Sequence, residues 1–313
     1  MSAPRVMNGY TERAPMATNS QGLVWQIGVW DRISEIYRDQ IDPRFEPVVD
    51  GLLRRAGLRV GDHVLDLGTG TGAAAAKAAA LVADEGLVLA VDISPEMLDR
   101  ARRRSEGCTA QFQVREGAAE AIPAEENAFD VILASLSLMY VINRAAAARE
   151  LARVLRPGGR LVGAVWSGPE SCDIVLFQQT AARFAPTPPV SGVGPGALGD
   201  TAPFLDQLAD CGIEAQVQTE VLGFDFDDFD SAWNTLAGVT AAQLPPERQE
   251  EAKVAVREAM WPDPTTPRSF RNTVQYIVGT CPGSTRNEPL FAIRPRAGGS
   301  SRITHQNIKP VID

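Results

Sequence analysis

Apolar strand-like segments alternate with helix-like segments from residue 63 onward, and this alternation limits the chain to few folds. HVLDL (63–67) precedes the alanine-rich TGAAAAKAAALVA (71–83), and LVLAVDI (87–93) precedes SPEMLDRARRR (94–104). Strands that alternate with helices of this length favour a parallel sheet with helices on its faces. The chain is therefore expected to form an α/β fold with a doubly wound, mostly parallel sheet.

The alternation continues along most of the chain. The helix-like segment 143–155 stops at the turn Arg156-Pro157-Gly158-Gly159, because proline and glycine do not continue a helix. Further strands are expected over 110–116, 129–136, 160–166, 213–224 and 272–280. Further helices are expected over 174–184, 203–212, 231–244 and 247–261.

These elements are expected to form one domain over residues 23–281, because doubly wound sheets reach this length around a single core. A loop rich in proline, glycine and serine runs as far as Asp200, and loops of this length usually carry a function. Segments at about 169–200 and 228–262 are therefore expected to form a helical lid inserted between the last strands.

The two ends of the chain differ from this domain in composition. Residues 1–22 are polar and contain proline and glycine, so we expect a flexible leader. Residues 282–313 carry five basic and two acidic residues and few apolar ones. This segment is expected to be a flexible tail or an intersubunit arm.

A helix is expected to begin near residue 23 and to carry an apolar face. Trp25, Trp30, Ile33, Ile36 and Tyr37 recur at helical spacing. We interpret this face as packing against the main core, and a lid over a ligand is the alternative.

Charge and composition exclude several classes of function. The net charge is −9, so the chain repels a nucleic-acid backbone. No apolar run reaches the length of a signal or membrane segment, and the four cysteines lack zinc-ligand spacing. We expect a cytoplasmic protein that binds no nucleic acid, membrane or metal and that can form homo-oligomers.

The segment VLDLGTGTG (64–72) is an apolar strand that ends in a glycine-rich turn ahead of a helix. Glycines let a ligand approach the backbone closely. Gly68, Gly70 and Ala73 also satisfy the looser dinucleotide fingerprint. Asp66, two residues before the first glycine, would repel a pyrophosphate but would tolerate an ammonium or sulfonium group.

Asp92 closes the next strand, where a carboxylate can accept hydrogen bonds from both hydroxyls of an adenosine ribose. An alternative role is to cap the helix that begins at Pro95, together with Ser94 and Glu96. We assign Ser94 as the cap and Asp92 as the ligand contact.

Five ordered motifs resemble the ubiquinone/menaquinone-type branch of class I S-adenosylmethionine (SAM)-dependent methyltransferases, also described as methyltransferase type 11. They are VLDLGTGTG (64–72), AVDISPEMLDRAR (90–102), EGAAEAIP (116–123), FDVILASLSLMYV (129–141) and LRPGGRL (155–161). The resemblance implies a Rossmann-like fold and SAM as the cofactor. By this resemblance, the methionine part of SAM is held by Asp66, Gly68, Thr69 and Gly70. The ribose is bound by Asp92, and the adenine is flanked by Ile93 and Met97. The site is completed by Ala118, Ala119 and Ser135.

The chain departs from this family at two positions. Ala118 stands where relatives often have an aspartate that bonds the adenine amino group, so backbone groups at Ala118 and Ala119 are expected to replace it. Met139 stands where relatives often place a histidine, so a histidine base is absent there.

A catalytic base must therefore come from another residue type. The chain has only His63 and His305, at a strand start and in the tail, away from the carboxyl ends of the strands where ligands bind. Glu170 is the best candidate, because it follows the strand that ends at Trp166. A solvated loop glutamate is the alternative, and Asp173 and Tyr140 are weaker candidates for the base. The substrate pocket is expected to include Tyr37, Met139, Tyr140 and Trp166, although aromatic residues also serve as plain core.

These motifs predict methyl transfer from SAM to an oxygen, nitrogen or carbon atom of a small, partly apolar metabolite. A substrate from bacterial specialised metabolism is an expectation by analogy. One alternative is a SAM-binding enzyme of this fold that catalyses a cyclisation or rearrangement without methyl transfer. A nicotinamide-dependent reductase is a further alternative, which Asp66 disfavours, and a non-enzymatic interaction module lacks any supporting repeat or basic patch.

Overall fold

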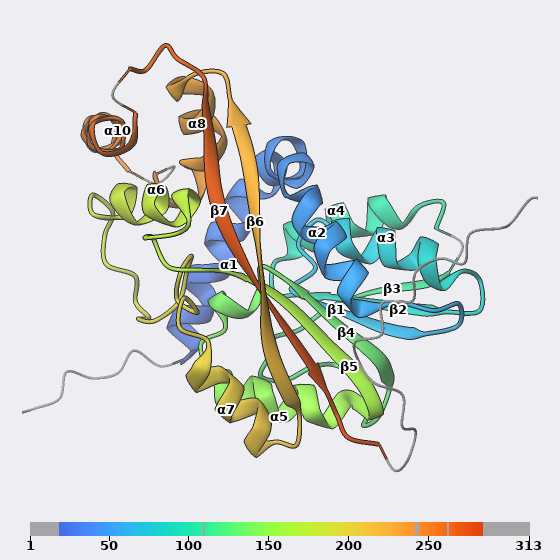
Figure 1. Ribbon diagram of the computed structural model, residues 1–313. Helices are drawn as coiled ribbons and strands as arrows, with labels where there is room; N and C mark the ends of the chain where they lie inside the picture. The colour runs from blue at the N-terminus through green and yellow to red at the C-terminus, as the bar shows by residue number, and fades with distance from the viewer. Residues whose placement is uncertain (1–18, 109, 242–243, 262, 284–313) are drawn as a thin grey trace, which may run out of the picture.

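The computed structural model describes residues 19–108, 110–241, 244–261 and 263–283, and these form a mostly parallel seven-stranded sheet (Figure 1). The strand order is β3-β2-β1-β4-β5-β7-β6. The first five strands pair in parallel, and β7 is antiparallel to both β5 and β6. The predicted fold class is confirmed. The strands are β1 (His63–Leu67), β2 (Leu87–Asp92), β3 (Gln111–Glu116), β4 (Phe129–Ser135), β5 (Leu155–Trp166), β6 (Glu214–Phe226) and β7 (Arg268–Thr280).

Helices lie on both faces of this sheet. Figure 1 shows α2 (Asp42–Ala56), α3 (Ala73–Val82) and α4 (Pro95–Ser105) on one side, and α5 (Arg144–Val154) and α7 (Ala202–Asp210) on the other. The central strands β1 and β4 are almost entirely buried between these layers. Their near-continuous apolar sequences are typical of strands covered on both faces.

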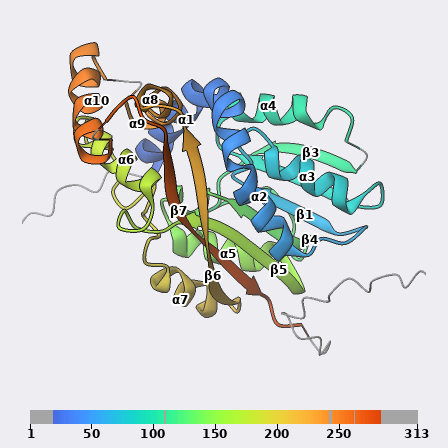
Figure 2. The same cartoon turned by 45° about the horizontal axis from the view of Figure 1, so that its top comes forward.

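A second group of helices packs beside one end of the long strands β6 and β7 (Figure 2). It contains α6 (Asp173–Ala182), which follows β5, and α8 (Phe229–Leu236), α9 (Gly238–Ala241) and α10 (Pro246–Met260), which connect β6 to β7. The single helix expected over 231–244 is divided at Ala237, which lies between α8 and α9 and just before Gly238, a residue of low helix propensity. These helices fall within residues 169–200 and 228–262.

The chain before β1 is more ordered than expected. Helix α1 spans Asn19–Ile36, so residues 19–22 of the expected leader are helical. The prediction was wrong there because Gly22 packs closely: a Cβ at this position would lie 3.1 Å from Ile142 Cδ1 and from Val190 Cβ. The rest of the expected leader lies outside the described residues, as does the expected tail from residue 284 onward.

A π-helical turn, Tyr37–Ile41, joins α1 to α2. The sequence patterns did not predict α2, because Pro43 and Pro47 interrupt its first half. Pro43 lies in the first turn, where its missing N–H is unpaired in any helix. The apolar face of α2 is buried against the sheet, through Val48, Val49, Leu52, Leu53 and Ala56.

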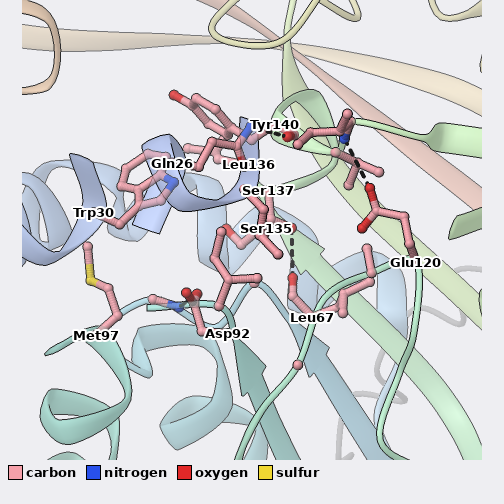
Figure 3. A pocket seen from close by; sticks show the side chains of 18 of the residues that line it. Gln26, Trp30, Leu67, Asp92, Met97, Glu120, Ser135, Leu136, Ser137 and Tyr140 are labelled. Atoms are coloured by element: carbon pink, nitrogen blue, oxygen red, sulfur yellow. Dashed lines mark hydrogen bonds between the residues drawn. The ribbon is translucent and has the colours of Figure 1, made fainter. Parts of the chain in front are cut away.

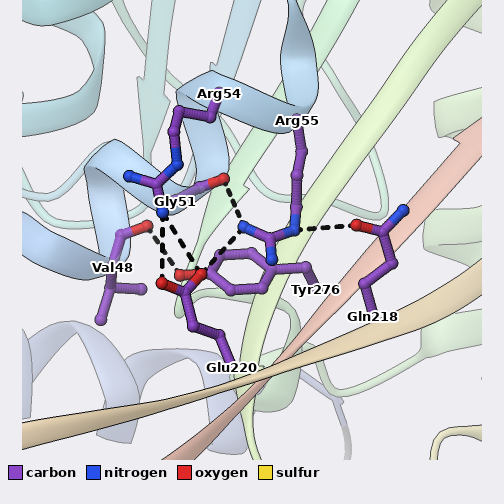
Figure 4. A network of polar contacts seen from close by, with 7 residues as sticks. All are labelled: Val48, Gly51, Arg54, Arg55, Gln218, Glu220 and Tyr276. Carbon is purple, nitrogen blue, oxygen red and sulfur yellow. Dashed lines mark hydrogen bonds and ion pairs between the residues drawn. The ribbon is translucent and has the colours of Figure 1, made fainter. Parts of the chain in front are cut away.

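A polar network fastens α2 to strands β6 and β7 (Figure 4). The Arg55 guanidinium donates to Gly51 O at 2.9 Å, to Glu220 Oε2 at 3.1 Å and to Gln218 Oε1 at 3.1 Å. It also stacks on the Tyr276 ring, 3.8 Å from the centroid. An arginine with several directed bonds and a ring contact holds the helix in one orientation.

Strand β5 begins five residues earlier than expected. Leu155 pairs with Phe129, and the pairing register then shifts before Arg160. Gly158 N donates to Cys281 O at 2.8 Å, and Cys281 N donates to Gly159 O at 3.1 Å. The expected turn therefore belongs to the strand edge, because its backbone groups find partners at the end of β7.

Candidate functional site

The turn between β1 and α3 is a glycine loop that requires left-handed backbone. Gly68, Gly70 and Gly72 have φ angles of 68°, 55° and 84°. Gly68 N and Thr69 N both donate to Val91 O, at 2.8 and 2.9 Å. A Cβ on Gly68 would lie 2.3 Å from Ser137 Cβ, whereas a Cβ on Gly70 would meet no atom within 4 Å. Gly68 thus packs against protein, and Gly70 borders open space.

Asp66 lies under this loop and is 1% exposed. Its Oδ2 accepts from Thr69 Oγ1 at 2.6 Å, while its buried Oδ1 has no partner among the described residues. Burial raises the pKa of Asp66 to about 6, and the Thr69 hydroxyl and the Ala75 backbone oppose this rise. The site therefore holds a carboxylate whose charge is poorly compensated by the protein.

Asp92 ends β2 and is also buried. Its Oδ2 accepts from Gly70 N at 2.8 Å, and its Oδ1 accepts from Ser94 N at 2.9 Å. Burial raises its pKa, and these backbone bonds oppose the rise. Asp92 therefore connects the glycine loop to the start of α4.

Ser94 is the N-cap of α4, as expected, because its Oγ accepts from Met97 N at 3.1 Å. The same hydroxyl donates to Asp31 Oδ1 of α1 at 2.6 Å. Asp31 thus ties α1 to α4, and Ser94, not Asp92, is the N-cap residue, although Asp92 accepts from the Ser94 backbone N–H.

A cavity opens beside the glycine loop, with an empty volume of about 800 Å³ that includes the open space at its mouth. We call it the glycine-loop cavity. Figure 3 shows Gln26 and Trp30 on one side of it, with Met97 and Asp92 below and Glu120 across from them. Its lining comprises Leu23, Gln26, Trp30, Tyr37, Leu67, Gly68, Gly70, Asp92, Ile93, Met97, Gly117, Ala119, Glu120, Ser135, Leu136, Ser137, Tyr140, Val141 and Ile142.

Most of the residues expected to bind the cofactor meet in this cavity. The residues brought together are Gly68, Gly70, Asp92, Ile93, Met97, Ala119 and Ser135. Asp66 and Thr69 lie behind the loop and do not line the cavity, because they bond to each other. Ala118 is also outside the lining, and its neighbour Gly117 takes that place.

Helix α1 covers the cavity, and packing against the core is only part of its role. Val29 and Ile33 are buried in the fold, but Trp30, together with Tyr37 at the start of the following π-helical turn, borders the cavity. Gln26 Nε2 donates to Tyr140 O at 2.8 Å and so fixes the helix over the site. The interpretation as simple core packing is corrected, because the two aromatic residues lie on the side that faces the ligand space.

A second, smaller cavity adjoins the first, with an empty volume of about 440 Å³ that includes open space. All four residues expected in the substrate pocket line this aromatic cavity. It shares four residues with the glycine-loop cavity: Trp30, Tyr37, Leu136 and Tyr140. The remaining lining residues are Ile41, Phe45, Met139, Trp166, Ile174, Gln178, Pro195 and Leu236.

The rings of the aromatic cavity pack edge to face. Trp30 and Tyr140 have centroids 4.8 Å apart, and Phe45 and Trp166 have centroids 5.3 Å apart. Burial raises the pKa of Tyr37 well above its usual value and also raises that of Tyr140. Both phenols are therefore neutral hydrogen-bond donors at neutral pH, and Tyr140 is a poor base.

Glu170 is not brought into either cavity. It is exposed in the turn after β5, and its carboxylate folds back so closely that a Cβ on Gly168 would lie 2.4 Å from it. Asp173 instead starts α6, and its Oδ2 accepts from Arg271 N at 2.8 Å. The structure therefore does not support Glu170 as a base at this site.

Three polar residues of the site escaped prediction from sequence. Glu120 Oε1 accepts from Ile142 N at 3.2 Å and from Asn143 N at 2.9 Å, which places its carboxylate at the cavity wall. Gln26 and Asp31 come from α1, far away in sequence. A glutamate within the motif EGAAEAIP was a usable signal for Glu120, whereas nothing local distinguishes Gln26 or Asp31.

No cluster of three or more histidine, cysteine, aspartate or glutamate side chains suited to a metal occurs among the described residues. None of the helices in that part of the chain has the length and apolarity needed to span a bilayer.

Comparison with known proteins links the glycine-loop half of the chain to methyltransferases. Residues 65–163 match the family model described as a methyltransferase domain. The ubiquinone/menaquinone biosynthesis C-methyltransferase UbiE of Francisella philomiragia is 37% identical over 119 residues, which cover 37% of this chain and 48% of the relative. An uncharacterized protein of Mycobacterium bovis is 33% identical over 155 residues, covering 50% and 52%. The chain thus spans about half the length of the curated relatives it matches.

Solved structures share the fold over a longer part of the chain. The YcgJ protein of Bacillus subtilis has a TM-score of 0.56 at 20% identity, covering 76% of this chain and 100% of that one. A putative methyltransferase of Bacillus halodurans has a TM-score of 0.55 at 21% identity, covering 75% and 98%. Residues 65–163 are thus similar to a methyltransferase domain, and the chain shares the fold of these two solved structures.

Proposed function

We propose that the chain is a SAM-dependent methyltransferase whose glycine-loop cavity binds SAM. Three features of the cavity fit this cofactor. Gly70 borders open space, so that a ligand can approach the loop backbone. The Asp92 carboxylate uses one bond on each oxygen, so further acceptor positions are free for ribose hydroxyls.

The third feature is the charge of the site. Asp66 carries an unpartnered buried oxygen behind the loop, and Asp92 and Glu120 add carboxylates at the cavity wall. Such a site favours a ligand with ammonium and sulfonium charges and repels a diphosphate. This charge distribution supports SAM over a nicotinamide dinucleotide.

When bound, SAM supplies an activated methyl group on a sulfonium centre. The role of the chain is then to hold the donor and the methyl acceptor in line and to exclude water. Such alignment can account for roughly 7–11 kcal/mol of barrier reduction. Trp30, Tyr37, Leu136 and Tyr140 would form this alignment region, because they border both cavities.

The observation that carries the proposal is the junction of the two cavities. One is bordered by the glycine loop and by carboxylates, and the other is bordered mainly by aromatic and aliphatic groups. This division suits a polar cofactor beside a small, partly apolar acceptor. The segments at about 169–200 and 228–262 would act as a lid, because Ile174, Pro195 and Leu236 come from them.

A SAM-dependent cyclisation would use the same cofactor cavity, so the test must detect the transferred methyl group itself. Purified protein is incubated with methyl-labelled SAM and pools of small, apolar metabolites. We expect label in an organic-extractable product with the native chain, and a large decrease with Asp92→Asn. Conversion of a substrate without transfer of label would support the cyclisation instead.

Cytoplasmic location, homo-oligomer formation and a role in bacterial specialised metabolism complete the proposal and are based on the sequence alone. A gel-filtration mass and the chemistry of the labelled product test the last two.

A further inference from the structure

The polar groups of the aromatic cavity are all uncharged, and this limits what the cavity can bind. Its described lining contains no aspartate, glutamate, histidine, lysine or arginine. The polar side chains are two indoles, two phenols and one amide, from Trp30, Trp166, Tyr37, Tyr140 and Gln178. Ligand recognition there must use neutral groups.

Four of these groups have hydrogens that no residue in the described part of the chain accepts. No hydrogen bond is made by the indole N–H of Trp30 or Trp166, or by the hydroxyl of Tyr37 or Tyr140, within that part of the chain. These four donor atoms are not fully enclosed by protein, because none of them is among the buried side-chain atoms that lack a partner. These groups are therefore donors that a ligand in the cavity can use.

Gln178 is the fifth donor, and it is held in place from two sides. Its Nε2 donates to Leu236 O at 2.6 Å, and its Oε1 accepts from the Thr240 hydroxyl. The side chain is buried in α6 and lines only the aromatic cavity. One amide N–H is left over, because an amide nitrogen has two donors. This donor is held in a fixed position, in the part of the aromatic cavity that is separate from the glycine-loop cavity.

We propose that the aromatic cavity takes an uncharged, largely apolar ring compound that carries an oxygen or nitrogen hydrogen-bond acceptor, and that Gln178 orients it through this atom. The inference rests on the proposed function. A carboxylate or phosphate ligand would lose its hydration without meeting a cation, which is costly in a buried site. An ammonium ligand would meet donors and no carboxylate in the described lining.

The same lining constrains the reaction. Methylation of an oxygen or nitrogen forms one bond to the methyl carbon and breaks the bond from that carbon to sulfur, whose electron pair stays on sulfur. Any proton on the acceptor atom is lost to bulk water once the methylated product leaves, because the described lining of the aromatic cavity offers no carboxylate or imidazole to take it during transfer. The acceptor must therefore be nucleophilic on its own, with the reacting atom near the four shared residues and its other polar atom at Gln178.

Binding of three isosteric probes tests this inference by titration calorimetry, with the protein saturated in S-adenosylhomocysteine (SAH). The probes are 2-acetylnaphthalene, with one neutral acceptor oxygen, 2-isopropenylnaphthalene, with none, and 2-naphthoate, with a charge. A fourth probe, trimethyl(2-naphthyl)ammonium, tests cation recognition by the rings. We expect the ketone to bind best and the naphthoate to bind worst.

Two variants locate the contact. Gln178→Met keeps the length of the side chain and should weaken the ketone about two- to tenfold, the loss of one hydrogen bond, while the hydrocarbon is unaffected. Gln179→Met is the matched control, because its side chain is exposed on the same helix and lines neither cavity. Ile174→Trp fills the cavity and should remove binding of all probes while SAH still binds.

Tighter binding of naphthoate or of the ammonium probe would overturn the inference, and so would equal weakening of ketone and hydrocarbon by Gln178→Met. SAH binding without binding of any probe would also overturn it and leave the proposed function standing. Absence of SAH binding by the native chain would instead contradict the proposed function.

Discussion

The buried charge of Asp66 predicts a substitution that stabilises the protein and weakens its ligand binding. A rise of the Asp66 pKa from 3.8 to about 6 corresponds to about 3 kcal/mol of folding free energy lost when this carboxyl ionises. Asp66→Asn removes the charge and keeps an oxygen that can accept from Thr69 Oγ1. The ligand-free variant should therefore be more stable than the native chain at neutral pH.

The sign of this effect depends on pH. Because the pKa is raised in the folded state, the native chain holds the Asp66 proton more tightly when folded, and it loses stability as pH rises from about 4 through 6. The stability difference between Asp66→Asn and the native chain should therefore be small at pH 4 and reach at most about 3 kcal/mol at pH 7.5. Asp92, whose pKa is also raised by burial, titrates in both proteins.

Urea unfolding at pH 4.0, 5.5 and 7.5 measures this difference. Asp99→Asn is the control, because Asp99 forms an exposed ion pair with Arg102 and should change stability little at any pH. At pH 7.5 the Asp66→Asn variant should also bind SAH more weakly, since the ligand ammonium loses the electrostatic attraction of the buried charge behind the glycine loop. A stability difference that is the same at all three pH values would refute the role of the buried charge.

Three further predictions follow from the packing of the site. Gly70→Ala should fold, at a cost of about 1–2 kcal/mol for its positive φ, yet lose SAH affinity because its methyl enters the ligand space, whereas Gly68→Ala should lose cooperative thermal unfolding because its Cβ meets Ser137. Arg55→Ala should lower the free energy of unfolding by about 2–3 kcal/mol, while the neighbouring Arg54→Ala, 60% exposed, should change it by less than about 1 kcal/mol; equal effects would contradict the network of Figure 4. Glu170→Gln should leave turnover within a few-fold of the native chain, and a decrease of roughly a hundredfold would restore Glu170 as a base.

The sequence predicted the elements whose patterns are local. β1 lies where HVLDL was read as a strand, and Ser94 caps α4, because both depend on neighbouring residues only. The glycine loop and Asp92 also fall in the cavity as expected, since parallel strands bring their carboxyl ends to one edge of the sheet.

Features that depend on distant contacts were harder to predict. Trp30 lies over the cavity because Gln26 bonds Tyr140 and Asp31 bonds Ser94, contacts between residues more than 60 positions apart. Helix α2 was missed because Pro43 and Pro47 argue against a helix, so that its apolar residues were not recognised as one helical face. Glu170 was chosen by its position after β5, but the direction of its side chain is set by the local turn at Gly168.

The central claim is that the glycine-loop cavity binds SAM, and calorimetric titration with SAH and with NAD⁺ tests it most directly. Asp66, Asp92 and Glu120 should favour the ligand that carries an ammonium group and should disfavour the diphosphate. We predict saturable binding of one SAH per chain and no measurable heat of binding for NAD⁺. Binding of NAD⁺ with displacement of SAH, or no binding of SAH, would contradict the claim.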